Sequence, residues 1–215
     1  MTALMRRRMM MAAKEQSGGG LPDTFQRVEW VGIPSKNGAY IDTGVACSAT
    51  TIRMVAKYVH LGSSDCYGVA TKKGDGSNNQ YSFFGYFSWK SQFAWGTYFY
   101  GPACSPNTVY EADATFKNRD QQVVLNGVSG SNDKTAYANG TGTFYIFGRN
   151  NDGAIGNQPA GMRFYYLRIY IDDELVRDCI PCYRKSDGEI GMYDFVSNSF
   201  FTNAGSGTFE KGDDV

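Results

Sequence analysis

The chain is 215 residues long and carries 21 basic and 21 acidic residues, so that its formal net charge is zero. That length suits one large β domain, because sandwiches of more than about 200 residues commonly form a single core. A nucleic-acid-binding protein normally has a basic excess or a basic stripe, so the charge balance argues against a nucleic acid as partner. No run approaches the roughly 18 consecutive apolar residues of a membrane span, which argues against a membrane-spanning protein.

Residues 1–20 differ in composition from the rest and form a predicted arm, and residues 21–215 form the predicted domain. A Gly-rich linker at Ser17–Gly20 separates the two. The short apolar run ends at Lys14, which argues against a secretory peptide and favours synthesis in the cytoplasm. The arm is either a disordered tail or an anchor that becomes ordered on a larger assembly. The anchor residues would be Arg6, Arg7, Arg8, Met9, Met10 and Met11.

Within residues 21–215, alternating apolar and polar residues predict short strands. In Thr51–Val59 and Thr108–Phe116, every second residue is apolar. Asn126-Gly127, after the apolar run Gln121–Leu125, predicts a tight hairpin. Further strands are expected at Tyr81–Phe87, Gln92–Tyr100, Thr143–Gly148 and Met162–Ile171. About a dozen strands exceed what a single sheet buries, so the fold class predicted is an all-β antiparallel sandwich of two packed sheets.

Two polar segments, Lys72–Gln80 and Arg149–Gln158, show no strand pattern and are rich in Asn, Asp and Gly. We expect both to be long loops. Loops held by a rigid scaffold commonly carry binding residues, so these two segments are the first candidates for a site.

The closing passage, residues 175–209, alternates short apolar runs with turns at Ser186–Gly188, Ser197-Asn198 and Asn203–Gly207. This passage resembles the last strands of a concanavalin A-like (laminin G-like) jelly-roll module. The segment Tyr40–Val45, after Arg27–Val31, resembles the opening strands of the same module. The resemblance implies a jelly roll over about residues 25–211. It also implies a setting, since such modules occur in tailed-phage and prophage structural proteins and in surface proteins of gut bacteria.

Some glycosidases with this jelly roll carry three carboxylates on one strand face, spaced by two or three residues. Glu111 and Asp113 match the first two positions, but Thr115 or Phe116 occupies the third. Retaining hydrolysis needs a carboxyl group that protonates the leaving oxygen, and neither residue supplies one. We therefore expect no glycosidase activity and, more broadly, no enzyme.

The only histidine, His60, ends a predicted strand and has no nucleophile motif around it, so we expect a histidine at a loop edge. Five scattered cysteines do not form a disulfide framework, and we expect free thiols. Cys179 and Cys182 have the spacing of a redox motif, but they lie in a predicted strand, where a thiolate is not stabilised.

The resemblance also implies a possible Ca²⁺ at the rim of the sandwich, with ligands from the two polar segments. Calcium takes six to eight oxygen ligands. Asp75 and Asp152 would be the carboxylate ligands, joined by Asn78, Asn79, Asn150 and Asn151. The same residue types are also common in turns, so turn formation remains the alternative.

Carbohydrate recognition combines aromatic rings with planar hydrogen-bonding groups, and the aromatic density of residues 81–100 favours such a platform. The site predicted lies at the rim made by the two polar segments, with Trp89 or Trp95 as the stacking ring. Burial of these rings in the core is the alternative. The remaining residues of the predicted site are Tyr98, Asn78, Asn79, Asn150, Asn151 and Asp152.

Together these features predict a non-enzymatic structural or adhesion protein of a phage or prophage particle. It would join other virion proteins through the arm and bind a host-surface glycan through the domain, as a homo-oligomer. A purely structural role without sugar binding, a glycoside hydrolase and a location on the bacterial cell surface are the alternatives.

Overall fold

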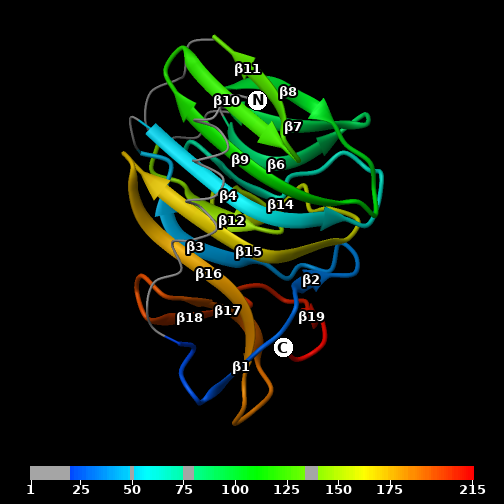
Figure 1. The fold of residues 1–215 in the computed structure, drawn as a ribbon, viewed down its shortest axis with the longest axis vertical. Coiled ribbons are helices and arrows are strands. Elements are labelled where there is room, and N and C mark those ends of the chain that lie inside the picture. Colours follow the sequence, from blue (N-terminus) through cyan, green and yellow to red (C-terminus); the bar gives the residue numbers. More distant parts are fainter. Residues whose placement is uncertain (1–19, 49–50, 75–79, 134–139) are drawn as a thin grey trace.

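A computed structural model describes residues 20–48, 51–74, 80–133 and 140–215. These residues form strands and no helix, so none of them forms a helix that could cross a membrane. The strands make two sheets, one of eleven strands and one of eight, which pack face to face. Figure 1 shows the long strands of the first sheet side by side, with strands of the second sheet behind them. The predicted all-β sandwich is confirmed.

The main path of the eleven-stranded sheet follows the order β11 (Val128–Asn132), β10 (Asp120–Leu125), β9 (Val109–Lys117), β4 (Thr51–His60), β15 (Met162–Ile171), β16 (Glu174–Arg184), β17 (Ile190–Asp194) and β18 (Ser199–Thr202). Three short strands join it, with β1 (Phe25–Arg27) on β16 and β2 (Val31–Ile33) between β15 and β19 (Glu210–Lys211). Every pairing in this sheet is antiparallel.

The main path of the eight-stranded sheet follows the order β14 (Ala154–Gly156), β13 (Gly148–Asn151), β5 (Val69–Lys72), β6 (Gln80–Phe87), β7 (Lys90–Trp95) and β8 (Thr97–Ala103). Strand β12 (Thr143–Ile146) pairs with β5 and with β3 (Ile41–Ala46). The pairing of β13 with β5 is parallel, and the other pairings are antiparallel.

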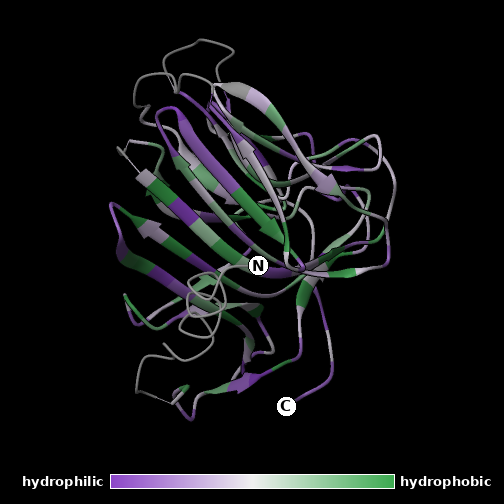
Figure 2. Cartoon of the chain, turned by 45° about the horizontal axis from the view of Figure 1, so that its top comes forward, coloured by the Kyte–Doolittle hydropathy of each residue, from purple (hydrophilic) through white to green (hydrophobic). Residues whose placement is uncertain are grey.

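Aromatic rings from both sheets meet in the core. Phe83 of β6 packs edge to face on Phe116 of β9, with ring centroids 4.9 Å apart. Trp95 of β7 stacks on the same Phe116 ring, and Phe84 contacts Phe164 of β15. Each such pair contributes about 0.5–1.5 kcal/mol beyond the burial of its area. Figure 2 shows the corresponding alternation of hydrophobic and hydrophilic residues along the strands.

The predicted strand faces and the predicted hairpin are confirmed. On β4, the alternate residues Ile52, Met54, Ala56 and Tyr58 are all buried. Asn126 and Gly127 join β10 to β11 with positive φ angles of 46° and 81°. This left-handed turn matches the twist of the paired strands.

A second, smaller cluster covers the outer side of β16 and β17. Ile180, Cys182 and Tyr193 form it, and Leu21 and Phe25 pack against it. The predicted first residue of the domain, Leu21, thus contacts the sandwich. The arm lies outside the described residues, so the boundary itself stays a prediction.

One loop prediction and one strand prediction are wrong. The segment Arg149–Gln158 is not an unpaired loop, because β13 and β14 pair across a tight turn at Asp152 and Gly153, both with positive φ. The segment Gln92–Tyr100 is two strands rather than one, since the chain turns at Gly96, where φ is +74°. The described residues form nineteen strands instead of about a dozen, because turns such as the one at Gly96 divide the runs into short pieces.

The two tryptophans of the aromatic segment give a stability prediction. Trp95 is 2% exposed and packs on Tyr81 and Phe116, whereas Trp89 is 60% exposed at the turn between β6 and β7. Trp95→Ala should lower the free energy of unfolding by about 3–5 kcal/mol, since it leaves a cavity. Trp89→Ala, as the matched control, should change it by about 0.5 kcal/mol or less. Denaturant unfolding of both variants tests this, and equal losses would contradict the assignment of core and surface.

Candidate functional site

Three exposed aromatic rings come from one continuous part of the second sheet. In the part of the chain that the structure describes, the exposed large hydrophobic side chains are four valines and the rings of Trp89, Tyr98 and Tyr100. Tyr98 and Tyr100 are 40% and 44% exposed on β8, and Trp89 lies at the β6–β7 turn. The prediction that Trp95 offers a stacking ring is wrong, because that ring fills the core between β7 and β9.

The register of the strands places Tyr98 and Tyr100 on the outward face of the sheet. Phe93 and Phe99 pair and pack in the core, so their neighbours Ala94 and Tyr98 point the opposite way. One outward row across the sheet reads Ala70, Ser82, Ala94 and Tyr98, and the next includes Gly85, Gln92 and Tyr100. We call this surface, defined by Ser82, Gln92, Ala94, Tyr98 and Tyr100, the outer-sheet face.

Three more polar side chains join the outer-sheet face. The hydroxyl of Tyr67, on the segment before β5, lies 3.3 Å from the hydroxyl of Tyr98. The guanidinium of Arg149 lies over the Tyr67 ring, 5.5 Å from its centroid. Its Nη1 donates a hydrogen bond of 2.6 Å to Oε1 of Gln80. Burial and the hydrogen bond with Tyr98 raise the pKa of Tyr67, so its phenol stays protonated and neutral.

Several polar atoms of this surface have no partner within the described residues. Ser82 Oγ and Arg149 Nε are buried without a hydrogen bond. The side chain of Gln92 lies on the same face and is 4% exposed. Buried polar groups normally have partners, so the unpaired Ser82 hydroxyl and Arg149 Nε mark this face as one whose own described side chains leave polar atoms unsatisfied.

The predicted rim does form a cavity, of about 450 Å³. Lys72 lies 3.3 Å from Asp152 across it, so the two polar segments meet as expected. Asn150, however, donates to the Thr143 carbonyl and accepts from the Gly153 amide, which holds the β13–β14 turn. Oδ1 of the next residue, Asn151, is buried and accepts no hydrogen bond from the described residues.

The calcium site stays a prediction, because Asp75, Asn78 and Asn79 lie outside the described residues. Among the described residues, no group of three or more His, Cys, Asp or Glu side chains is placed to hold a metal ion. Asp152 is the one carboxylate residue lining the rim cavity within that part of the chain, and it pairs with Lys72. The anchor residues Arg6, Arg7, Arg8, Met9, Met10 and Met11 also lie outside the described residues.

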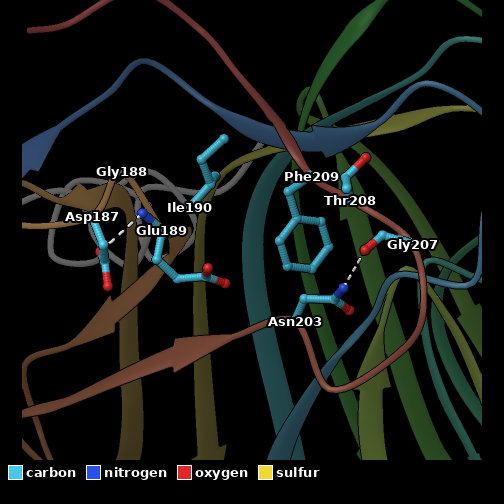
Figure 3. Close-up of a pocket in the computed structure, with 8 residues that line it drawn as sticks. All are labelled: Asp187, Gly188, Glu189, Ile190, Asn203, Gly207, Thr208 and Phe209. Atoms are coloured by element: carbon cyan, nitrogen blue, oxygen red, sulfur yellow. Dashed lines mark hydrogen bonds between the residues drawn. The ribbon is translucent and has the colours of Figure 1, made fainter.

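The sequence did not indicate a second hollow, of about 310 Å³, between the β16–β17 turn and the loop before β19. Figure 3 shows residues 187–190 on one side of it, where Asp187 accepts from the Glu189 amide, and on the other side Asn203, which donates to the Gly207 carbonyl of its own loop. Asp187 also pairs with Arg184. These side chains hold the turns themselves, so this hollow is the weaker candidate.

The paired carboxylates lie on the other sheet. Glu111 is exposed, and both oxygens of Asp113 accept hydrogen bonds of 2.9 Å from Arg53. Phe116 is in the core, on the opposite face of β9. The predicted shared face of Glu111 and Asp113 is therefore confirmed, and Asp113 is held in an ion pair by Arg53.

His60 is not at a loop edge, as predicted, but buried at the end of β4. Its Nε2 lies 3.0 Å from the Phe84 carbonyl, which can only accept, so Nε2 carries the proton and Nδ1 faces the Cys66 thiol. Burial lowers the pKa of His60 to about 4 and raises the pKa of Cys66 to about 12. Both groups stay neutral near pH 7, so the pair lacks the thiolate that nucleophilic catalysis needs.

All five cysteines are free and buried, as expected. Cys179 and Cys182 lie on β16, and burial raises the pKa of both thiols. Their spacing therefore reflects strand packing and not redox chemistry.

Comparison with solved structures supports the fold. Domains LG4-5 of the mouse laminin α1 chain are similar to this chain, with a TM-score of 0.52 and 10% identity, over 89% of this chain and 47% of that one. The chain thus spans about half the length of the laminin fragment. No protein-family model and no curated protein matches the chain.

Two other solved structures are less similar. One is a variant of alginate lyase A1-II′, with a TM-score of 0.34 and 15% identity over 61% of this chain and 66% of that one. The other is Scytalido-glutamic peptidase with a peptide-based transition-state analogue, with a TM-score of 0.36 and 14% identity over 87% of this chain and 98% of that one. The laminin similarity and the two-sheet topology together give this chain a concanavalin A-like (laminin G-like) jelly-roll fold.

The neutral His60 makes stability depend on pH. Its pKa is about 4 in the folded chain, below the usual value of 6.5. The unfolded chain therefore binds the extra proton between these values, and the free energy of unfolding falls as pH falls through that window. Between pH 6.5 and pH 5 the slope should approach 1.4 kcal/mol per pH unit, roughly. His60→Gln, which keeps a donor for the Phe84 carbonyl, should flatten the profile over that range. Parallel profiles for the two proteins would contradict the assignment.

Proposed function

We propose that this laminin G-like sandwich is a non-enzymatic adhesion module that binds a carbohydrate on the outer-sheet face. The observation that carries the proposal is the pair of exposed rings of Tyr98 and Tyr100, with the amide side chain of Gln92 at the position paired with Tyr100. Aromatic faces stack on the C–H surface of sugar rings, and a planar amide hydrogen-bonds adjacent hydroxyls. This site replaces the predicted rim, whose Asn150 amide is occupied by the β13–β14 turn.

The surface supports weak binding at each copy. Two partly exposed tyrosines contribute little area, so one site would hold a glycan only loosely. Useful attachment would then require several copies on one particle, because linked sites multiply weak affinities. A homo-oligomer, most simply a closed cyclic one, would supply those copies.

The setting that we propose is a phage or prophage virion, with the arm of residues 1–20 joining other virion proteins. Its support is the resemblance of the opening and closing strands to modules of such particles. A bacterial cell surface is the alternative location, and a purely structural decoration without sugar binding is the alternative role. A glycoside hydrolase is disfavoured because Thr115 or Phe116 replaces the third carboxylate and Arg53 holds Asp113.

A glycan array followed by titration tests the proposed site. Tyr98→Ala and Tyr100→Ala should each weaken binding by about 2- to 10-fold, which corresponds to the loss of one aromatic contact. Both side chains are partly exposed, so the melting temperature should change little. Val109→Ala, at an exposed position of the other sheet, is the matched control and should leave binding unchanged.

Two outcomes would contradict the site. One is an array on which no glycan binds, which would favour the purely structural role. The other is full binding by the doubly substituted protein, Tyr98→Ala with Tyr100→Ala, which would place the glycan elsewhere.

The role of the arm has its own test. A chain that begins at Leu21 should fold with an unchanged melting temperature, because it keeps Leu21 and Phe25, which pack against the smaller cluster. It should fail to join the virion or the cell surface to which the full chain attaches. Normal incorporation of the shortened chain would show that the domain itself mediates attachment.

A further inference from the structure

Arg149 lies on the same row as Tyr98. Its strand, β13, pairs in parallel with β5 and sets Arg149 beside Ala70. The row then continues through Ser82 and Ala94 to Tyr98. Ala70, Ser82 and Ala94 are fully buried. The side chain of Tyr67 joins the two ends of the row, because its ring contacts Arg149 and its hydroxyl lies 3.3 Å from that of Tyr98.

The charge of Arg149 has no counter-charge within the described residues. Four other arginines of the chain, Arg53, Arg168, Arg177 and Arg184, each lie within ion-pair distance of an aspartate. Arg149 instead contacts the neutral groups of Gln80 and Tyr67, and its Nε is buried and unpaired. A partly buried charge without a counter-charge is costly, and an anionic ligand would remove part of that cost.

The neutral contacts also orient the guanidinium. Gln80 fixes Nη1, and the Tyr67 ring supports the plane of the group. Nη2 makes no hydrogen bond with the described residues, and unlike Nε it is not fully buried. It can therefore donate to a ligand. A held, planar donor suits a carboxylate, whose geometry matches the arginine fork.

We propose that the outer-sheet face takes an acidic glycan, with a uronate carboxylate at Arg149 and a sugar ring on Tyr98. This inference rests on the proposed carbohydrate-binding function and names its ligand class. An acidic peptide is the disfavoured occupant. Extended peptides commonly add to a free sheet edge. At the Arg149 end β13 already pairs with β5 and β14, so a peptide would add at β8, the edge strand at the Tyr98 end, away from the arginine.

The test compares uronate oligosaccharides with their carboxyl-reduced, neutral counterparts of equal length, by calorimetric titration at low ionic strength. The intact chain should bind the acidic form about 10-fold more tightly, as one ion pair in a partly desolvated site allows. The preference should shrink as salt is added. Arg149→Gln should abolish the preference while keeping binding of the neutral form.

Two further variants separate the charge from the fold and from the stacking ring. Arg149→Lys keeps the charge and should keep part of the preference, so the proposal remains testable if Arg149→Gln lowers stability. Tyr98→Ala should weaken the acidic and neutral forms equally, because it removes the ring and not the charge.

The outcomes distinguish this inference from the proposed function. Equal affinity for the acidic and neutral forms would overturn the acidic ligand and leave carbohydrate binding in place. Tighter binding of poly-glutamate than of every uronate oligosaccharide would overturn the sugar in favour of an acidic peptide. Failure of the intact chain to bind any member of the panel would overturn both proposals.

Discussion

The packing of the two sheets through one layer of aromatic rings is the constraint on which the rest of the structure depends. A register shift in β6, between Ser82 and Gly85, turns the consecutive residues Phe83 and Phe84 both toward the core. Phe84 adopts a left-handed φ of 55° there, a conformation that costs a bulky residue about 1–2 kcal/mol. Contacts with rings of the facing sheet offset that cost. Bulges of this kind re-aim the side chains that follow, and here the next outward row holds Gly85, Gln92 and Tyr100.

The two outer surfaces of the sandwich also differ in how their charges are paired. On the eleven-stranded sheet, several outward charges are matched, as in the bidentate pair of Arg53 with Asp113 and the buried pair of Arg168 with Asp178, whereas Arg163 lies over the Trp30 ring. On the eight-stranded sheet, the rings of Tyr98 and Tyr100 are exposed and Arg149 lacks an acidic partner within the described residues. Matched charges stabilise a surface in water. Unmatched groups beside exposed rings are instead what a ligand-binding surface requires, which is why our proposals concern the second sheet.

Much of the fold follows from residue patterns, and the exceptions have physical causes. Alternation on β4 and β9 and the Asn126-Gly127 turn act over a few residues, so the sequence predicts them well. The β13–β14 hairpin escapes prediction because Arg149–Gly156 has few apolar residues and its pairing depends on β5. The candidate site is harder to predict from the sequence than the fold. Trp95 follows Phe93 by two positions and shares its core face. The two-residue period of a strand could therefore have predicted that Trp95 is buried. Tyr67, Gln80 and Arg149 come from three separate segments, and only the completed sheet brings them together.

Mapping a bound uronate oligosaccharide by NMR chemical-shift perturbation tests the central claim most directly, since it locates the ligand without any substitution. The account predicts perturbations that follow one outward row, from Arg149 through Ser82 and Ala94 to Tyr98, and that extend to Gln92 and Tyr100. Perturbations confined to the rim at Lys72 and Asp152, or to the eleven-stranded sheet around Asp113, would contradict it.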